Sequence, residues 1–117
     1  MTIQRLENVG IVVDDLAAAT TFFVDIAMLE TPDGHGRLEL MKFHAPPARA
    51  GDRNAPPNTL GIRRIAFAVD DIDAAVAGLQ ARGAELLGGV ERYEDSYRLC
   101  YVRGPEGIIV MLAEQIG

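Results

Sequence analysis

The sequence predicts an α+β fold built from two similar halves. Residues 6–19, LENVGIVVDDLAAA, recur as residues 62–75, IRRIAFAVDDIDAA, at an offset of 56 residues (64 − 8). Each copy begins with a short β-rich run and continues into an Ala-rich stretch with helical propensity. Further short apolar runs follow each copy and are separated by turns that contain Gly and Pro. A repeat of this kind indicates one structural unit present twice.

The first half is expected to contain a strand, a helix and a hairpin. The strand covers residues 9–13 and ends at the double Asp of residues 14–15, which can cap a helix and favour its positive end. The hairpin is predicted from strands at residues 27–30 and 37–43, which flank the turn sequence TPDGHG.

The second half repeats the strand and the helix and then continues for longer. A strand at residues 65–69 precedes a second double Asp, after which Ile72, Val76 and Leu79 fall at helical spacing. That helix is expected to end near residues 82–83, where Gly can adopt the left-handed C-cap conformation. Three more strands are predicted at residues 84–90, 98–102 and 108–113, the last two joined by a tight turn of sequence GPEG.

The two halves are expected to pack as a single domain, because neither has enough residues for a core of its own. Module one covers residues 1–45 and module two covers residues 61–117. Residues 46–60, rich in Pro, Ala and Asn, are interpreted as an extended connector.

Composition excludes several classes of function. The chain has 117 residues and a formal net charge of −6, whereas nucleic-acid-binding proteins and proteins of anionic membrane surfaces usually present a basic face. We therefore expect no nucleic-acid partner and no membrane association. The single cysteine, Cys100, rules out an intramolecular disulfide and suits a cytoplasmic protein.

The duplicated pattern resembles the vicinal oxygen chelate superfamily, the group of glyoxalases, bleomycin resistance proteins and extradiol dioxygenases. The resemblance is strongest in IRRIAFAVDDIDAAVAGLQARGAEL and YVRGPEGIIVML. It implies tandem βαβββ-type modules that form a curled mixed sheet around a cleft. In family enzymes, the first and last strands of each module supply His and Glu ligands to a divalent metal in that cleft.

At these four positions the chain departs from the family pattern. Asn8 and Arg64 stand where the first strands commonly carry His, and Met111 stands where the last strand of module two commonly carries Glu. Glu39 alone keeps the family type. Arg64 cannot bind a cation, and Met111 is a poor ligand for a hard metal, so we expect no metal and no cofactor.

Arg64 places a fixed positive charge roughly where the metal would sit. Glu39 is its natural partner, and a bidentate pair inside a partly buried pocket would satisfy both groups. The alternative is that both side chains simply face solvent. Tyr101, the third of three tyrosines spaced four residues apart, is expected to line the same pocket, although all three could equally pack the sheet.

Module one is shorter than module two. The offset between Glu39 and Met111 is 72 residues (111 − 39), 16 more than the offset of the first strands (72 − 56). One strand of module one is therefore expected to be missing, through a deletion or an omitted stretch. Such a loss would leave a sheet edge uncovered, which favours a homodimer.

The remaining polar candidates have structural interpretations. His35 is predicted to be an exposed turn residue, His44 to lie on the strand face opposite Glu39, and Cys100 to be a buried, inert thiol.

Three functions stay open from the sequence. The first is a metal-independent protein that binds a small polar or anionic organic molecule through Asn8, Glu39, Arg64, Tyr101 and Met111. The second is an isomerase or lyase of the same superfamily with Glu39 as general base. The third is a module without activity in which a partner chain replaces the missing strand.

Overall fold

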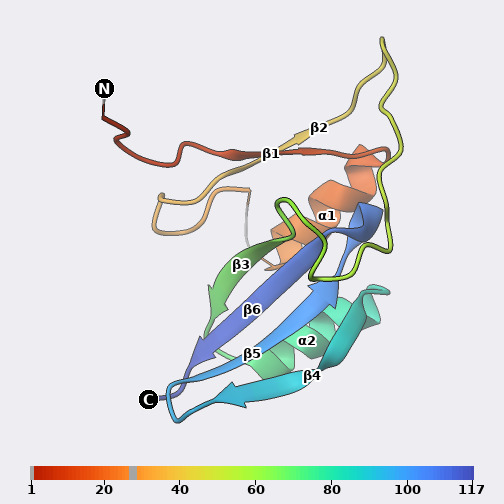
Figure 1. Cartoon of the computed structure of the whole chain (residues 1–117). Coiled ribbons are helices and arrows are strands. Elements are labelled where there is room, and N and C mark those ends of the chain that lie inside the picture. The colour runs from red at the N-terminus through yellow and green to blue at the C-terminus, as the bar shows by residue number, and fades with distance from the viewer. Residues whose placement is uncertain (1, 27–28) are drawn as a thin grey trace. The chain divides into compact units, whose positions relative to one another are not determined.

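A computed structural model describes residues 2–26 and 29–117 of the chain. The chain divides into two compact units, residues 1–50 and 51–117 (Figure 1). The described part of the chain is mixed α+β, as the sequence predicted, with strands in two separate sheets. None of its helices has the length and hydropathy needed to cross a membrane.

Unit one contains β1 (Val9–Val12), α1 (Leu16–Ile26) and β2 (Leu38–Met41). The two strands pair in parallel. The helix begins after the double Asp because Asp15 Oδ1 accepts a hydrogen bond of 2.9 Å from the Ala18 amide, which would otherwise lack a partner in the first turn. The predicted strand and helix are therefore confirmed.

The predicted hairpin of unit one is reduced to a single bridge. Glu30 bridges to Arg37 in antiparallel fashion, and Thr31 and Asp33 hold the turn between them through a hydroxyl–carboxylate hydrogen bond of 2.6 Å. Part of the strand predicted at residues 27–30 lies outside the described residues. The strand predicted at residues 37–43 is shorter than expected, because β2 pairs only with the four residues of β1.

Unit two contains a complete four-stranded sheet in the order β3-β6-β5-β4, with β3 and β6 parallel and the other pairs antiparallel. One helix, α2, covers one face of this sheet (Figure 1). The elements, in chain order, are β3 (Arg64–Val69), α2 (Ile72–Ala81), β4 (Glu85–Tyr93), β5 (Tyr97–Arg103), the single 3₁₀ turn η1 (Pro105–Gly107) and β6 (Ile109–Gln115).

The helix ends where the sequence predicted. Asp71 caps its N-terminus by accepting a hydrogen bond from the Ala74 amide, and Gly83 follows its C-cap with a φ of +89°, in the left-handed region. Every second residue of the strands points toward α2, because side chains alternate along a strand. The apolar stripe of α2 packs against these residues. The buried core of this unit includes Ile72, Val76, Leu79, Cys100, Val102, Val110 and Leu112.

Strand register confirms the internal repeat. In unit one, Val9 pairs with Leu38, and in unit two, Ile65 pairs with Val110. The same offsets of 56 and 72 residues carry Gly10 and its partner Glu39 onto Ala66 and its partner Met111. The first and last strands of each half are therefore equivalent, and Glu39 and Met111 occupy the same place in their respective sheets.

Candidate functional site

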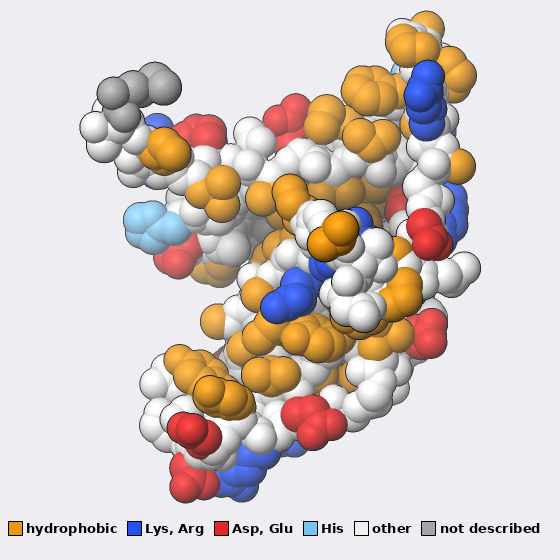
Figure 2. Space-filling model, viewed as in Figure 1, with side chains coloured by type: hydrophobic (Ala, Val, Ile, Leu, Met, Phe, Trp, Pro, Cys, Tyr) orange, Lys and Arg blue, Asp and Glu red, His pale blue; other side chains and the backbone are white. Residues whose placement is uncertain are grey.

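The face of the unit-two sheet opposite α2 carries most of the candidate residues of this unit. Met111 on β6 has two cross-strand partners, Ala66 on β3 and Tyr101 on β5. Arg64, two residues before Ala66, shares their face because strand residues alternate. Figure 2 shows hydrophobic side chains gathered over these strands. We call this surface the open face.

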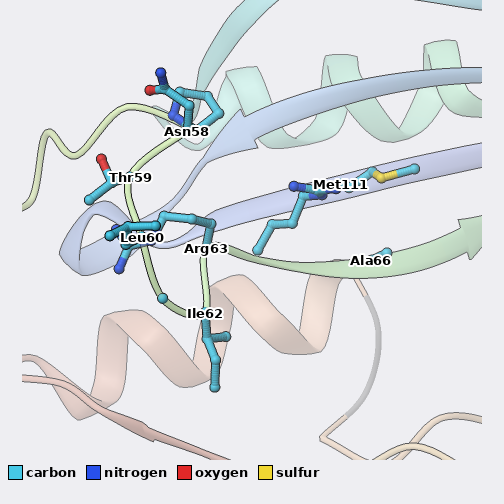
Figure 3. A pocket seen from close by; sticks show the side chains of 10 residues that line it. Asn58, Thr59, Leu60, Ile62, Arg63, Ala66 and Met111 are labelled. Atoms are coloured by element: carbon cyan, nitrogen blue, oxygen red, sulfur yellow. The ribbon is translucent and has the colours of Figure 1, made fainter.

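An open hollow of about 610 Å³ lies where the chain enters β3. Loop 57–63 forms one side of it, and strand residues form the other (Figure 3). Its lining is polar and apolar in about equal parts, and the polar part includes two guanidinium groups. The lining residues are Pro57, Asn58, Thr59, Leu60, Gly61, Ile62, Arg63, Arg64, Ala66 and Met111.

The Arg64 guanidinium stacks over an aromatic ring at the hollow. Its Cζ atom lies 5.3 Å from the centroid of Tyr101, within the range of a cation–π contact. The ring leaves the in-plane N–H groups of the guanidinium able to donate to a ligand. Tyr101 is half-buried and does not line the hollow itself, so it contacts the ligand site only through Arg64.

Arg63 is a site residue that the sequence interpretation missed. Its Nε atom is buried and has no hydrogen-bond partner among the described residues. Such a buried donor is unfavourable unless a partner is supplied. No local pattern pointed to it, because alternation turns only the second residue of the Arg-Arg pair, Arg64, toward the open face.

The other two predicted site residues belong to unit one. Glu39 is exposed on β2, and Asn8 is exposed immediately before β1. Alternation places Asn8 on the same side as Gly10, the cross-strand partner of Glu39. The pairing of Glu39 with Arg64 of unit two stays a prediction, and a double-mutant cycle between the two positions tests it.

The remaining candidates have ordinary surroundings. His35 is exposed in its turn, and Tyr93 and Tyr97 are exposed on the sheet, at 60% and 41%. Cys100 is buried, as predicted, and burial raises the pKa of its thiol, which disfavours the reactive thiolate. Across residues 2–26 and 29–117, no group of three or more His, Cys, Asp and Glu side chains comes together in a way that could hold a metal ion.

A model of the glyoxalase/bleomycin resistance protein/dioxygenase superfamily matches residues 5–112. The chain belongs to this superfamily. The match covers both halves, and it confirms the family that the duplicated Val-Asp-Asp pattern indicated.

Solved structures and a curated relative agree with the superfamily assignment. A glyoxalase family protein from Bacillus cereus is 42% identical, with a TM-score of 0.94 over 100% of this chain and 97% of that one. TnmS3, an antibiotic binding protein from Streptomyces sp. CB03234, shares the fold with a TM-score of 0.66 at 18% identity, over 98% of each chain. The uncharacterized protein YaeR of Escherichia coli is 29% identical and covers 97% of this chain and 98% of its own length.

The alignment with YaeR is longer than this chain. It runs over 131 positions, more than the 117 residues of this chain, so at least 14 of them (131 − 117) stand opposite gaps here. Between α1 and β2, the described residues of unit one hold an antiparallel bridge from Glu30 to Arg37 and no counterpart of β4. This agrees with the expectation that module one has one strand fewer than module two.

Proposed function

We propose that this chain is a metal-independent member of the superfamily that binds a small organic anion, with Arg64 as the anchor for the anionic group. One observation carries the proposal. The residue at a family metal position is a guanidinium that stacks on Tyr101 and faces a hollow. A planar guanidinium held in place in this way is suited to bidentate recognition of a carboxylate or phosphate.

The composition of the hollow indicates what else the ligand carries. Arg63 and Arg64 make no ion pair within the described residues of unit two, so both positive charges are available to one anion. Leu60, Ala66 and Met111 offer apolar surface beside them. The ligand is therefore amphipathic, with a charged end near the two arginines and an apolar body along the strands.

The residues at the four family positions do not fit a divalent metal. Arg64 only donates hydrogen bonds and remains protonated, and the Met111 thioether is a poor ligand for a hard cation. The Asn8 amide is neutral, which leaves Glu39 as the single carboxylate. A single carboxylate is too few ligands for a divalent metal, so the proposed binding uses no metal.

The relatives support binding as a function without naming the ligand. TnmS3, which shares the fold over almost the whole chain, is an antibiotic binding protein. We extend to this chain only the capture of a small molecule, since a shared fold locates a site but does not choose its substrate.

A thermal-shift panel tests the proposal. Benzoate, phenylphosphonate and hexanoate are each compared with the neutral amide or ester of the same body, for the wild-type protein and for Arg64→Met. We expect at least one anion to raise the wild-type melting temperature more than its neutral analogue does, and this difference to disappear in Arg64→Met. Arg92→Met, a matched change at an exposed arginine of β4, should behave as the wild type does. An equal response of Arg64→Met would overturn the anchor.

Elemental analysis and product analysis complete the test. Purified protein should carry no stoichiometric transition metal, and a chelator should leave the thermal shift unchanged. About one Ni, Mn, Fe or Zn per chain, with binding lost on chelation, would contradict metal independence. Conversion of a bound ligand that is abolished by Glu39→Gln would replace the proposal with the isomerase or lyase alternative.

We further propose that the protein is a homodimer located in the cytoplasm. The reason to expect a dimer is the two-stranded sheet of unit one, because so small a sheet has only marginal stability without added pairing or packing. Sedimentation at micromolar concentration should give twice the chain mass of 12.6 kDa. Only monomer at that concentration would argue against the dimer.

A further inference from the structure

A single arginine at the end of β5 binds three backbone carbonyl groups in two other segments of unit two. Arg103 Nη1 donates to the carbonyl oxygens of Arg53 and Gly107, both at 3.1 Å. Arg103 Nη2 donates to the carbonyl oxygen of Ala55 at 3.0 Å. Such charge-assisted bonds from one rigid fork fix the positions of their acceptors. We call residues 53–55 the strap.

The strap packs against the turn between β5 and β6. Arg53 Nη2 lies 2.7 Å from Glu106 Oε2, and the Glu106 side chain is only 15% exposed. Ala55 is 4% exposed. A Cβ atom added at Gly107 would lie 2.2 Å from the carbonyl oxygen of Arg53, so a residue without a side chain is required where the strap crosses. These contacts hold the strap by backbone, side chain and packing together.

The strap leads directly into the loop that walls the hollow. Only Pro56 separates Ala55 from Pro57, the first lining residue, and the Thr59 amide donates to the Pro56 carbonyl oxygen at 3.0 Å. At its other end, the loop enters β3 at Arg64, whose cross-strand partner is Ile109.

The two residues that hold the ends of loop 57–63, Arg103 through the strap and Arg64 at the start of β3, lie in the same cross-strand row of the sheet. Ile109 pairs with Arg64 on one side and with Arg103 on the other. The two arginines therefore share the open face, on the two strands that flank β6, but have different partners: Tyr101 for Arg64 and backbone carbonyls for Arg103.

We propose that Arg103 is a positioning residue for the ligand site: it locks the strap so that loop 57–63 keeps its place as the wall of the hollow. It acts through the loop and does not itself touch the ligand. This inference rests on the proposed binding function, because a wall is useful only if the hollow is occupied. Two arginines in one row of the sheet thus have different roles: Arg64 recognises the charge of the ligand, and Arg103 positions the loop.

The decisive variant is Arg103→Lys, which keeps the positive charge but loses the fork. Trypsin cleavage at the Arg53–Asn54 bond reports on the strap without any ligand, and cleavage at the exposed Arg49–Ala50 bond serves as an internal reference. Relative to that reference, we expect cleavage after Arg53 to be about tenfold faster in Arg103→Lys, as local opening becomes easier. Arg92→Lys is the matched control and should leave the cleavage pattern unchanged.

Ligand affinity supplies the second readout. With phenylphosphonate and its neutral diethyl ester as probes, Arg103→Lys should weaken both by a similar factor, about tenfold, as expected when a wall of the site moves. Arg64→Met should weaken only the charged probe. Unchanged cleavage and unchanged affinity in Arg103→Lys would overturn the inference. Loss for the charged probe alone would also overturn it, because that result assigns Arg103 an electrostatic role.

Two further outcomes keep this test separate from that of the proposed function. If no anion of the thermal-shift panel binds the wild type, the binding proposal and the positioning role of Arg103 are both overturned. Faster cleavage after Arg53 in Arg103→Lys would then still show that Arg103 holds the strap in place. If Arg103→Lys does not fold, Glu106→Gln replaces it, since this change weakens the contact of the turn with Arg53 and leaves Arg103 intact. Glu106→Gln should accelerate the same cleavage by a smaller factor, and no acceleration would overturn the lock.

Discussion

The two units of this chain begin alike and then diverge. In both, a strand leads to a double Asp whose second member caps a helix, through Asp15 Oδ1 in unit one and Asp71 Oδ1 in unit two. In both, the last strand pairs in parallel with the first. Unit two places β4 and β5 between them in sequence, whereas the residues described between α1 and β2 of unit one form a single antiparallel bridge.

The difference teaches which parts of the fold are local and which are cooperative. A strand, a cap and a helix form in both units because neighbouring residues specify them. A closed apolar layer forms where α2 contacts three strands, β4, β5 and β6, whereas α1 contacts β2 of its two-stranded sheet. We therefore expect unit two to be the more stable region.

Equivalent leucines on β6 and β2 test this expectation with the largest effect. Leu112 is 0% exposed, whereas Leu40, its counterpart at the 72-residue offset, is half-buried. Leu112→Ala should lower the free energy of unfolding by about 3 kcal/mol, since it removes packed methyl groups and leaves a cavity. Leu40→Ala should cost about 1 kcal/mol by the same argument, because its neighbourhood can relax. Urea unfolding measures both, and equal losses would contradict the comparison.

Amide hydrogen exchange compares the two sheets directly. The amides of β5 and β6, which belong to interior strands of the four-stranded sheet, should exchange at least about tenfold more slowly than those of β1 and β2. The physical reason is that β1 and β2 each have one neighbour and open with little loss of packing. Peptide-resolved mass spectrometry gives the rates. Slower exchange in β1 and β2 would show that unit one is the stable element.

The helix caps should have smaller effects, of similar size in the two units. Asp15→Ala and Asp71→Ala should each destabilise the protein by about 1 kcal/mol, as is typical for loss of an N-cap side chain. Asp→Asn at either position keeps the acceptor oxygen and serves as the control. Thermal unfolding measures the changes. A cap that matters in only one unit would show that tertiary contacts, rather than local hydrogen bonds, start the other helix.

The smallest effect concerns an ion pair that unit one lacks. Arg98 on β5 donates to both carboxylate oxygens of Asp73 at 2.9 Å, and Ala17 stands at the equivalent position in α1. The hydrogen bond from Arg98 holds the pKa of Asp73 below its ordinary value of 3.8. A lowered carboxyl pKa stabilises the fold above that value, and the stabilisation is lost as pH falls through the folded-state pKa.

Asp73→Asn should therefore be slightly less stable than the wild type at pH 6 and should approach it at pH 2. Urea midpoints at the two pH values give the difference, and Ala17→Asn is the matched change in unit one. A gap that stays constant between pH 6 and pH 2 would mean that the Asp73 charge contributes nothing to stability.

Much of the fold and part of the site could be predicted from the sequence. Both helices, the strand at the start of each half and the missing strand followed from periodicity, caps and spacing. The hairpin strands of unit one were predicted too long, since their extent depends on partners that β1 is too short to provide. Arg63 was missed because nothing local shows that its Nε atom is buried without a hydrogen-bond partner.

The sequence by itself determined the repeat, the superfamily and the residue types at its metal positions, because these are properties of order and spacing along the chain. Only the tertiary structure decided what those residues meet. Arg64 stacks on Tyr101, and Arg103 reaches carbonyl groups 48 and 50 residues earlier in the chain. These contacts depend on β5, β6 and β3 lying side by side, since pairing between distant strands brings together groups that no local pattern links.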